Sequence, residues 1–135
     1  MLEIVSFTLG PAQTNAYLVA DSETKEAAVI DPSWDGHIIL EAAQKRGWRI
    51  AHLWYTHAHF DHFLASGAMK EATGAVLCLH QDDLDLWRNL DVQCRMFGVP
   101  SGAVPMPDYW LRDEEKILLG DIPVVALHTP GHTPG

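Results

Sequence analysis

Three histidines and an aspartate lie within seven residues, in the segment Thr56-His57-Ala58-His59-Phe60-Asp61-His62. Imidazole and carboxylate groups are the usual protein ligands of zinc, iron and manganese. Alternate side chains of an extended segment point the same way, so His57 and His59 are predicted to bind one ion together. Asp61 and His62 follow without a spacer at the predicted start of a helix, where neighbouring side chains diverge by roughly 100°. They are therefore predicted to face a second, adjacent metal position.

Asp61 has a competing interpretation. It precedes a predicted helix over residues 63–72, and aspartate is a favoured N-cap residue. Histidines in loops are also often only solvated, but four candidate ligands in the six positions 57–62 favour a metal site. One carboxylate can serve as both cap and ligand, so both interpretations of Asp61 stay open.

A second pair of histidines lies in the final segment, residues 127–135, which reads LHTPGHTPG. Its two prolines exclude a helix. His128 continues a predicted strand and is interpreted as structural. His132 lies beyond the tight turn and is predicted to complete a three-histidine set with His57 and His59.

Strands and helices alternate through the middle of the chain, which is an α/β pattern. The predicted strands cover residues 2–9, 16–20, 27–30, 50–55 and 75–79, with a hairpin at 116–119 and 123–127. The predicted helices cover residues 35–46, 63–72 and about 82–96, and the segment 98–108 is predicted to be a loop. The first of these helices has an apolar face at helical spacing and is predicted to end at Gly47. Ligands in α/β folds bind beyond the carboxyl ends of strands, where residues 57–62 fall.

Composition limits the class of protein. The 135 residues make one domain, 1–135, or part of one, and 47% apolar with 20% charged residues is typical of a globular chain. The net charge of −9 argues against nucleic acid or an anionic membrane as a partner. No segment has the length of a membrane span or the pattern of a signal peptide, so a cytoplasmic location is expected. Cys78 and Cys94 are predicted to be buried thiols.

Together, the motifs T-H-x-H-x-D-H at 56–62 and T-P-G-H-T at 129–133 resemble the metallo-β-lactamase superfamily, in particular its glyoxalase II-like branch, the hydroxyacylglutathione hydrolases. Supporting matches are T-N-A-Y-L-V at 14–19 and A-V-I-D-P at 28–32. The resemblance implies a four-layer αββα sandwich with the site at one edge. The chain is expected to supply roughly the first half to two-thirds of that sandwich.

The resemblance also implies a ligand set. His57, His59 and His132 would hold one metal, and Asp61 and His62 the second. Asp61 would also act as the catalytic residue that orients the attacking water. Zinc is the expected cofactor, with one or two ions in the complete family site and iron or manganese as alternatives.

Members of that family continue beyond the P-G-H-T turn, through an aspartate that bridges both metals and a last histidine, and this sequence has neither. We therefore expect either a truncated product or a half-module. Its exposed sheet face would be covered by a dimer partner or by a complementing C-terminal fragment.

The expected function is zinc-dependent hydrolysis of a thioester or related small acyl substrate by a metal-activated water. One alternative is a mononuclear iron oxygenase resembling the persulfide dioxygenases, and another is an inactive metal-binding fragment. An amidohydrolase barrel also begins its site with His-x-His, but its eight β/α units need far more than 135 residues.

Overall fold

A six-stranded mixed sheet forms the centre of the computed structural model, which describes residues 1–135. The strands lie in chain order: β1 (Leu2–Leu9), β2 (Thr14–Asp21), β3 (Glu26–Ile30), β4 (Arg49–Trp54), β5 (Val76–His80) and β6 (Tyr109–Leu111). Short turns join β1, β2 and β3, which pair antiparallel. Helical connections join β3 to β4 and β4 to β5, and these strands therefore pair parallel, as does β6 with β5.

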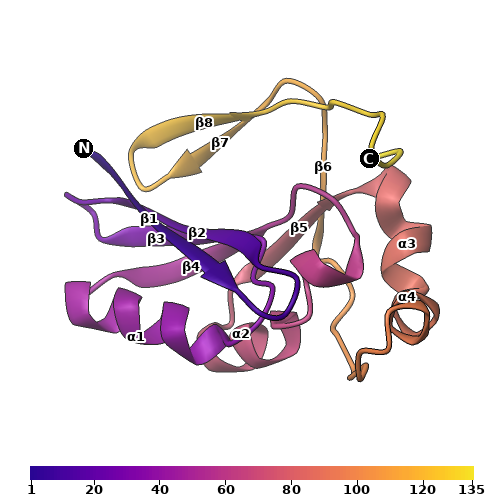
Figure 1. Cartoon of the computed structure of the whole chain (residues 1–135). Helices are drawn as coiled ribbons and strands as arrows, with labels where there is room; N and C mark the ends of the chain where they lie inside the picture. The colour runs from indigo at the N-terminus through magenta and orange to yellow at the C-terminus, as the bar shows by residue number, and fades with distance from the viewer.

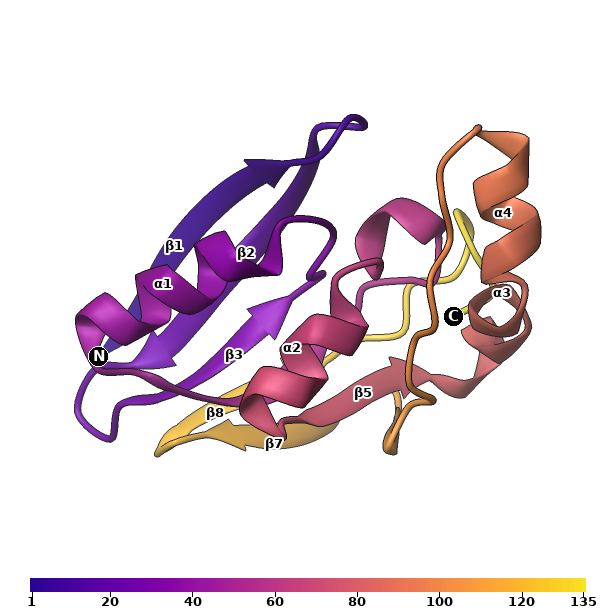
Figure 2. The same ribbon diagram turned by 90° about the horizontal axis from the view of Figure 1, so that it is seen from below.

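Helices α1 (Gly36–Arg46) and α2 (Ser66–Thr73) cover one face of this sheet, as Figure 2 shows. The hairpin of β7 (Glu115–Leu119) and β8 (Ile122–Ala126) lies over the opposite face (Figure 1). Each helix ends at a glycine with a left-handed backbone, Gly47 at φ 70° and Gly74 at φ 65°. The glycine at position 47 and the bounds of α1 agree with the sequence prediction.

The two sheet faces build two separate apolar clusters. Strand residues alternate between faces, so Leu53 and Leu77 pack on the helix side in a cluster of 23 buried residues. Trp54 and Cys78 point to the other side and pack with Leu119 of the hairpin. Both cysteines are buried and free, as predicted.

The expected metallo-β-lactamase-like α/β fold is therefore confirmed, and residues 1–135 form three of its four layers: helices, mixed sheet and second sheet. Two further helices, α3 (Leu84–Arg88) and α4 (Leu90–Met96), lie beyond the carboxyl end of β5 (Figure 1). None of the helices is both long and apolar enough to cross a membrane.

Three local predictions were wrong. The helix expected over 82–96 is broken at Asn89, whose side chain donates to the Asp85 carbonyl at 2.8 Å and so competes with the backbone. Strand β6 was missed because it has only three residues after a proline-rich loop.

The third error concerns the helix expected over 63–72. Residues Phe60–His62 form a separate 3₁₀ turn, η1, and α2 begins at Ser66. Ala65 is the N-cap residue of α2, and no side chain caps that end of the helix. The interpretation of Asp61 as the N-cap of this helix is therefore wrong.

Candidate metal centre

The candidate ligands gather at one edge of the sheet, because the carboxyl ends of β3, β4 and β5 meet there with the amino end of β2. Asp31 follows β3, the segment 55–62 follows β4, and Thr14 is the first residue of β2. The chain leaves β8 and brings residues 128–135 back over the same edge (Figure 1).

His57, His59 and His132 come together from two loops. Their ligand nitrogens all lie within 4.8 Å of one another, and His59 Nδ1 is 3.0 Å from His132 Nε2. Nitrogens at 2.0–2.1 Å from one tetrahedral zinc ion would be about 3.3 to 3.4 Å apart. The structure thus shows the convergence that the sequence predicted, while metal binding itself stays a prediction.

Hydrogen bonds select which nitrogen His57 offers. The Thr56 hydroxyl donates its only hydrogen to Asp31 Oδ2 at 2.6 Å, because a carboxylate can only accept. His57 Nδ1 lies 2.9 Å from the same hydroxyl oxygen, which has no further hydrogen to donate. Nδ1 must therefore carry the proton of the neutral ring and donate it to that oxygen. Nε2 of His57 keeps its lone pair, is buried and has no hydrogen-bond partner. A metal ion would satisfy this nitrogen, so the donor set fits a divalent cation.

The second pair of predicted ligands lies beside the first set. The His62 ring centroid is 4.0 Å from that of His57, and His62 Nε2 is 3.5 Å from Asp61 Oδ2. His62 Nδ1 donates to Asp31 Oδ2 at 2.9 Å, which again leaves Nε2 as the ligand atom. Thr14 donates to Asp61 Oδ2 at 2.9 Å and fixes that carboxylate. Asp61 and His62 therefore face a position adjacent to the histidine set.

The surroundings keep His57 and His59 neutral. Burial, together with the nearby His62, lowers the pKa of His57 to about 4. Burial and the proximity of His132 also lower the pKa of His59. Burial opposes the charge on His62, but the hydrogen bond and charge of Asp31 outweigh it and raise the pKa of that residue. Neutral imidazole is the form that binds metals, so His57 and His59 are ready to do so at pH 7.

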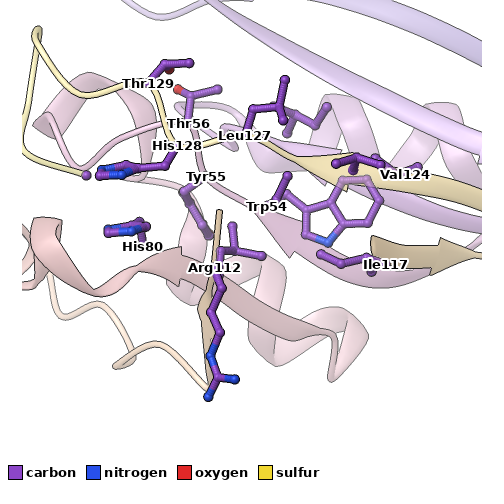
Figure 3. A pocket seen from close by; sticks show the side chains of 15 residues that line it. Trp54, Tyr55, Thr56, His80, Arg112, Ile117, Val124, Leu127, His128 and Thr129 are labelled. Atoms are coloured by element: carbon purple, nitrogen blue, oxygen red, sulfur yellow. The ribbon is translucent and has the colours of Figure 1, made fainter. Parts of the chain in front are cut away.

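The candidate ligands open onto a cavity of about 380 Å³, whose walls include Ala12, Gln93 and Phe97. Another cavity, of about 300 Å³, lies between the central sheet and the hairpin (Figure 3). The second cavity is lined by Trp54, Ile117 and Val124 and contains none of the predicted ligands.

His80, Asp82 and His128 form another cluster of possible ligands, and His80 and His128 line the second cavity. The rings of His80 and His128 are stacked, as Figure 3 shows, with centroids 4.0 Å apart and planes at 5°. Imidazole lone pairs lie in the ring plane, so two parallel stacked rings cannot both direct a nitrogen at one ion. His128 Nε2 also bonds the Pro134 carbonyl at 2.9 Å. The geometry agrees with the structural role predicted for His128.

No site role was predicted for Asp31, Thr56 or Thr14. Asp31 was noted only as part of the A-V-I-D-P match, and its φ of 55° is unusual for a residue with a side chain. Its carboxylate accepts the Thr56 amide at 2.8 Å in addition to the two bonds described above. One sequence signal could have identified Asp31 as a site residue. It is an aspartate at the carboxyl end of the strand that lies beside the histidine-bearing strand in the sheet.

A carboxylate- and histidine-rich centre at the edge of a layered α/β sheet is typical of metal-dependent hydrolases. The chain belongs to the metallo-beta-lactamase superfamily, whose family model matches residues 9–135.

Among known proteins, the chain is similar to the hydroxyacylglutathione hydrolase GloC of Haemophilus influenzae, with 33% identity over 99% of this chain and 63% of the relative. It is similar in structure to the BLEG-1 B3 metallo-beta-lactamase, with a TM-score of 0.86 and 30% identity over 98% of this chain and 64% of the other. It is also similar in structure to TTHA1623 in a di-iron-bound form, with a TM-score of 0.85 and 36% identity over 97% of this chain and 63% of the other. The chain thus spans somewhat less than two-thirds of these proteins.

Proposed function

We propose that the protein is a metal-dependent hydrolase of a thioester or related small acyl substrate. The proposal rests on one observation above all. His57, His59 and His132 converge, and the buried Nε2 of His57 has no partner within the protein. The similarity to a hydroxyacylglutathione hydrolase favours a thioester over the other electrophiles that such a site accepts.

The ligands of the first ion would be His57 through Nε2, together with His59 and His132. When bound, a divalent ion supplies an acidified water and polarises a carbonyl group. Asp61 is the residue that accepts a hydrogen bond from the attacking water and orients it. The Thr14 hydroxyl holds Asp61 in place, and the Asp31 carboxylate does the same for the His62 ring.

Zinc is the metal that we propose, because three histidines are a common catalytic zinc set. Asp61 and His62 alone are too few ligands to retain a second ion tightly, so we expect at most one tightly held ion per chain. Two ions at full occupancy, bound only by these 135 residues, would refute this expectation.

The test compares two histidines of the same turn. The purified chain and its His132→Ala and His128→Ala variants are titrated with zinc in competition with a chelating dye. They are then assayed with a hydroxyacylglutathione thioester. His132→Ala should lose tight binding and any hydrolysis, whereas His128→Ala should keep both. Equal zinc affinity in the two variants would exclude His132 as a ligand.

A second candidate function is oxygenation at a mononuclear iron centre, as in the persulfide dioxygenases, and the similarity to a protein in a di-iron-bound form supports iron as the metal. The chain is loaded with Fe(II) without oxygen, and oxygen uptake is then followed with a persulfide substrate. Uptake that depends on the persulfide, in the absence of thioester hydrolysis, would replace our proposal with this one.

We also propose a cytoplasmic location. Cys78 and Cys94 are buried and unbonded, which is usual in a reducing compartment. Fusion of the chain to a fluorescent reporter, followed by cell fractionation, tests the location.

A further inference from the structure

Asp83 is a fully buried carboxylate between the two loops that carry the candidate ligands. It lies in the 3₁₀ turn η2 (Gln81–Asp83), which joins β5 to α3. Buried carboxylates are rare because desolvation is costly, and they need hydrogen bonds to compensate. The partners of Asp83 therefore indicate what the residue does.

Three donors converge on this side chain. Asp83 Oδ2 accepts the Ala58 amide at 3.0 Å and the Thr133 hydroxyl at 2.8 Å. Oδ1 accepts the Gly135 amide at 2.6 Å. Hydrogen bonds to an ionised acceptor are roughly twice as strong as neutral ones. A single carboxylate thus connects two chain segments that are far apart in sequence.

The positions of the donors relate Asp83 to the metal centre. Ala58 lies between His57 and His59, and Thr133 directly follows His132. Asp83 therefore bonds the backbone of one ligand loop and the side chain and backbone of the other. The 3.0 Å separation of His59 Nδ1 from His132 Nε2 depends on the relative position of these two loops.

Gly135 packs tightly against the carboxylate. A Cβ atom at this position would lie 2.7 Å from Asp83 Cγ, which is closer than real contacts allow. On the other side, the Gln93 side chain of α4 bonds the Phe60 amide at 2.9 Å and the Ala58 carbonyl at 3.1 Å. The loop of His57 and His59 is thus held by Asp83 and Gln93, but of these two only Asp83 also holds the His132 turn.

We propose that Asp83 is a positioning residue that fixes the distance between the two ligand loops and thereby sets the metal affinity of the three-histidine set. The inference rests on the metal centre proposed above. Without this carboxylate, the His132 turn would have to be ordered by the ion itself, and that ordering would reduce the binding free energy. Partners that orient metal ligands typically change the affinity 10- to 100-fold when they are mutated.

Asp83→Asn is the informative variant. It keeps the size and one acceptor oxygen but directs an amide NH₂ at one or two of the three donors. Thr133→Val removes only the bond to the turn while keeping the shape of the side chain. The matched control is Asp21→Asn, since Asp21 is equally buried and accepts the Glu23 and Asp121 amides, away from the ligands.

Two measurements are made on each variant. Zinc affinity is measured by chelator competition, and hydrogen exchange is followed by mass spectrometry on the metal-free chain. We expect Asp83→Asn to bind zinc about 10- to 100-fold more weakly and Thr133→Val to shift in the same direction by less. In Asp83→Asn, amide hydrogen exchange should become faster in both ligand loops, residues 57–59 and residues 131–135. Asp21→Asn should leave exchange in 57–59 unchanged and should change zinc affinity much less than Asp83→Asn does, because Asp21 bonds the β7–β8 turn and neither ligand loop.

The outcomes separate this inference from the proposed function. Tight zinc binding by the wild-type chain, with no loss in Asp83→Asn or Thr133→Val, would overturn the inference and leave the function standing. An equal loss in Asp21→Asn would overturn it too, because general destabilisation would then be the cause. A wild-type chain that binds no zinc would contradict the function. Exchange in the two loops would then still decide whether Asp83 connects them.

Discussion

One hydroxyl and one carboxylate determine which nitrogen each of two candidate ligands offers. Thr56 accepts from His57 Nδ1 only because its own hydrogen goes to Asp31, and Asp31 accepts directly from His62 Nδ1. Each of the two imidazoles therefore keeps a lone pair on Nε2 that is free to bind a metal ion at the candidate positions. Asp31 thus acts on both positions although it is not predicted to bind either ion.

Replacing Asp31 by Asn should weaken zinc binding about 10- to 100-fold. The amide NH₂ of Asn can only donate where the carboxylate accepted, so the Thr56 hydroxyl and His62 lose a shared acceptor. Zinc affinity is measured by competition with a chelating dye, and Asp35→Asn, an exposed position at the start of α1, is the control. Unchanged affinity in Asp31→Asn would show that ring orientation depends on packing alone.

The histidine set should also make the metal-free chain sensitive to acid. The pKa of His57 falls from its ordinary 6.5 to about 4 on folding, chiefly because of burial. Between pH 6.5 and about 4, His57 binds a proton in the unfolded chain but not in the folded chain. The stability that neutral His57 allows is therefore fully present above pH 6.5 and is lost as the pH falls towards 4.

Urea unfolding of metal-free wild type and His57→Gln at pH 7 and pH 5 measures this contribution. We expect wild type to lose more stability over that interval than the variant does. The shift at His59 acts in the same direction and the raised pKa of His62 in the opposite direction, but both are common to the two chains. Parallel losses would contradict the assignment to His57.

Among the elements, the β7–β8 hairpin links folding to the metal centre, because the chain runs from β8 into the His132 turn. Leu119 is completely buried and packs with Trp54 and Cys78 of the central sheet, whereas its neighbour Leu118 is 58% exposed. Leu119 is therefore the residue of the hairpin that attaches it most firmly to the sheet.

Leu119→Ala should lower the free energy of unfolding by about 2–5 kcal/mol and weaken zinc binding along with it. Leu118→Ala, the matched control, should change stability by no more than about 0.5 kcal/mol. Urea denaturation followed by tryptophan fluorescence measures both. Similar losses in the two variants would mean that the hairpin does not depend on this contact.

The elements and residues that could be predicted share one property: the sequence pattern that indicates them lies within a few neighbouring positions. Helix α1 was located from its apolar spacing and Gly47, and the candidate ligands in 57–62 from their residue types and spacing. Short β6 carries too few residues for a pattern, and the break at Asn89 depends on a side-chain bond within the helical run. Asp83 contacts residues 25 to 52 positions away in the sequence, so only the fold could show its role.

At the scale of the whole molecule, one sheet face is left open. The outward side of the hairpin and the segment after it carry three exposed apolar residues, Leu118, Val125 and Leu127, at 58%, 49% and 67% exposure. We propose that this face pairs with a second copy of the chain or with a complementing C-terminal fragment. Exposed apolar side chains on one face favour contact with a partner.

Light scattering at micromolar concentration should therefore show a dimer or a larger species for the 135-residue chain. A variant with Leu118→Lys and Val125→Lys should shift towards the monomer, because charges disfavour contact between apolar faces. A wild-type chain that stays monomeric without any accompanying polypeptide would rule the proposal out.

The two cysteines belong to different apolar clusters and can therefore report on separate parts of the fold. Cys78 lies under the hairpin, where burial raises its thiol pKa to about 12, and Cys94 lies in the helix-side core. Neither thiol reacts quickly while it is covered, because the thiolate is the reactive form. The rate at which a maleimide modifies Cys78 in a Cys94→Ala chain thus measures how often the hairpin lifts from the sheet. The rate for Cys94 in a Cys78→Ala chain measures how often α4 separates from the helix-side core. If zinc slows the first rate and leaves the second unchanged, the metal stabilises the hairpin and not the whole fold.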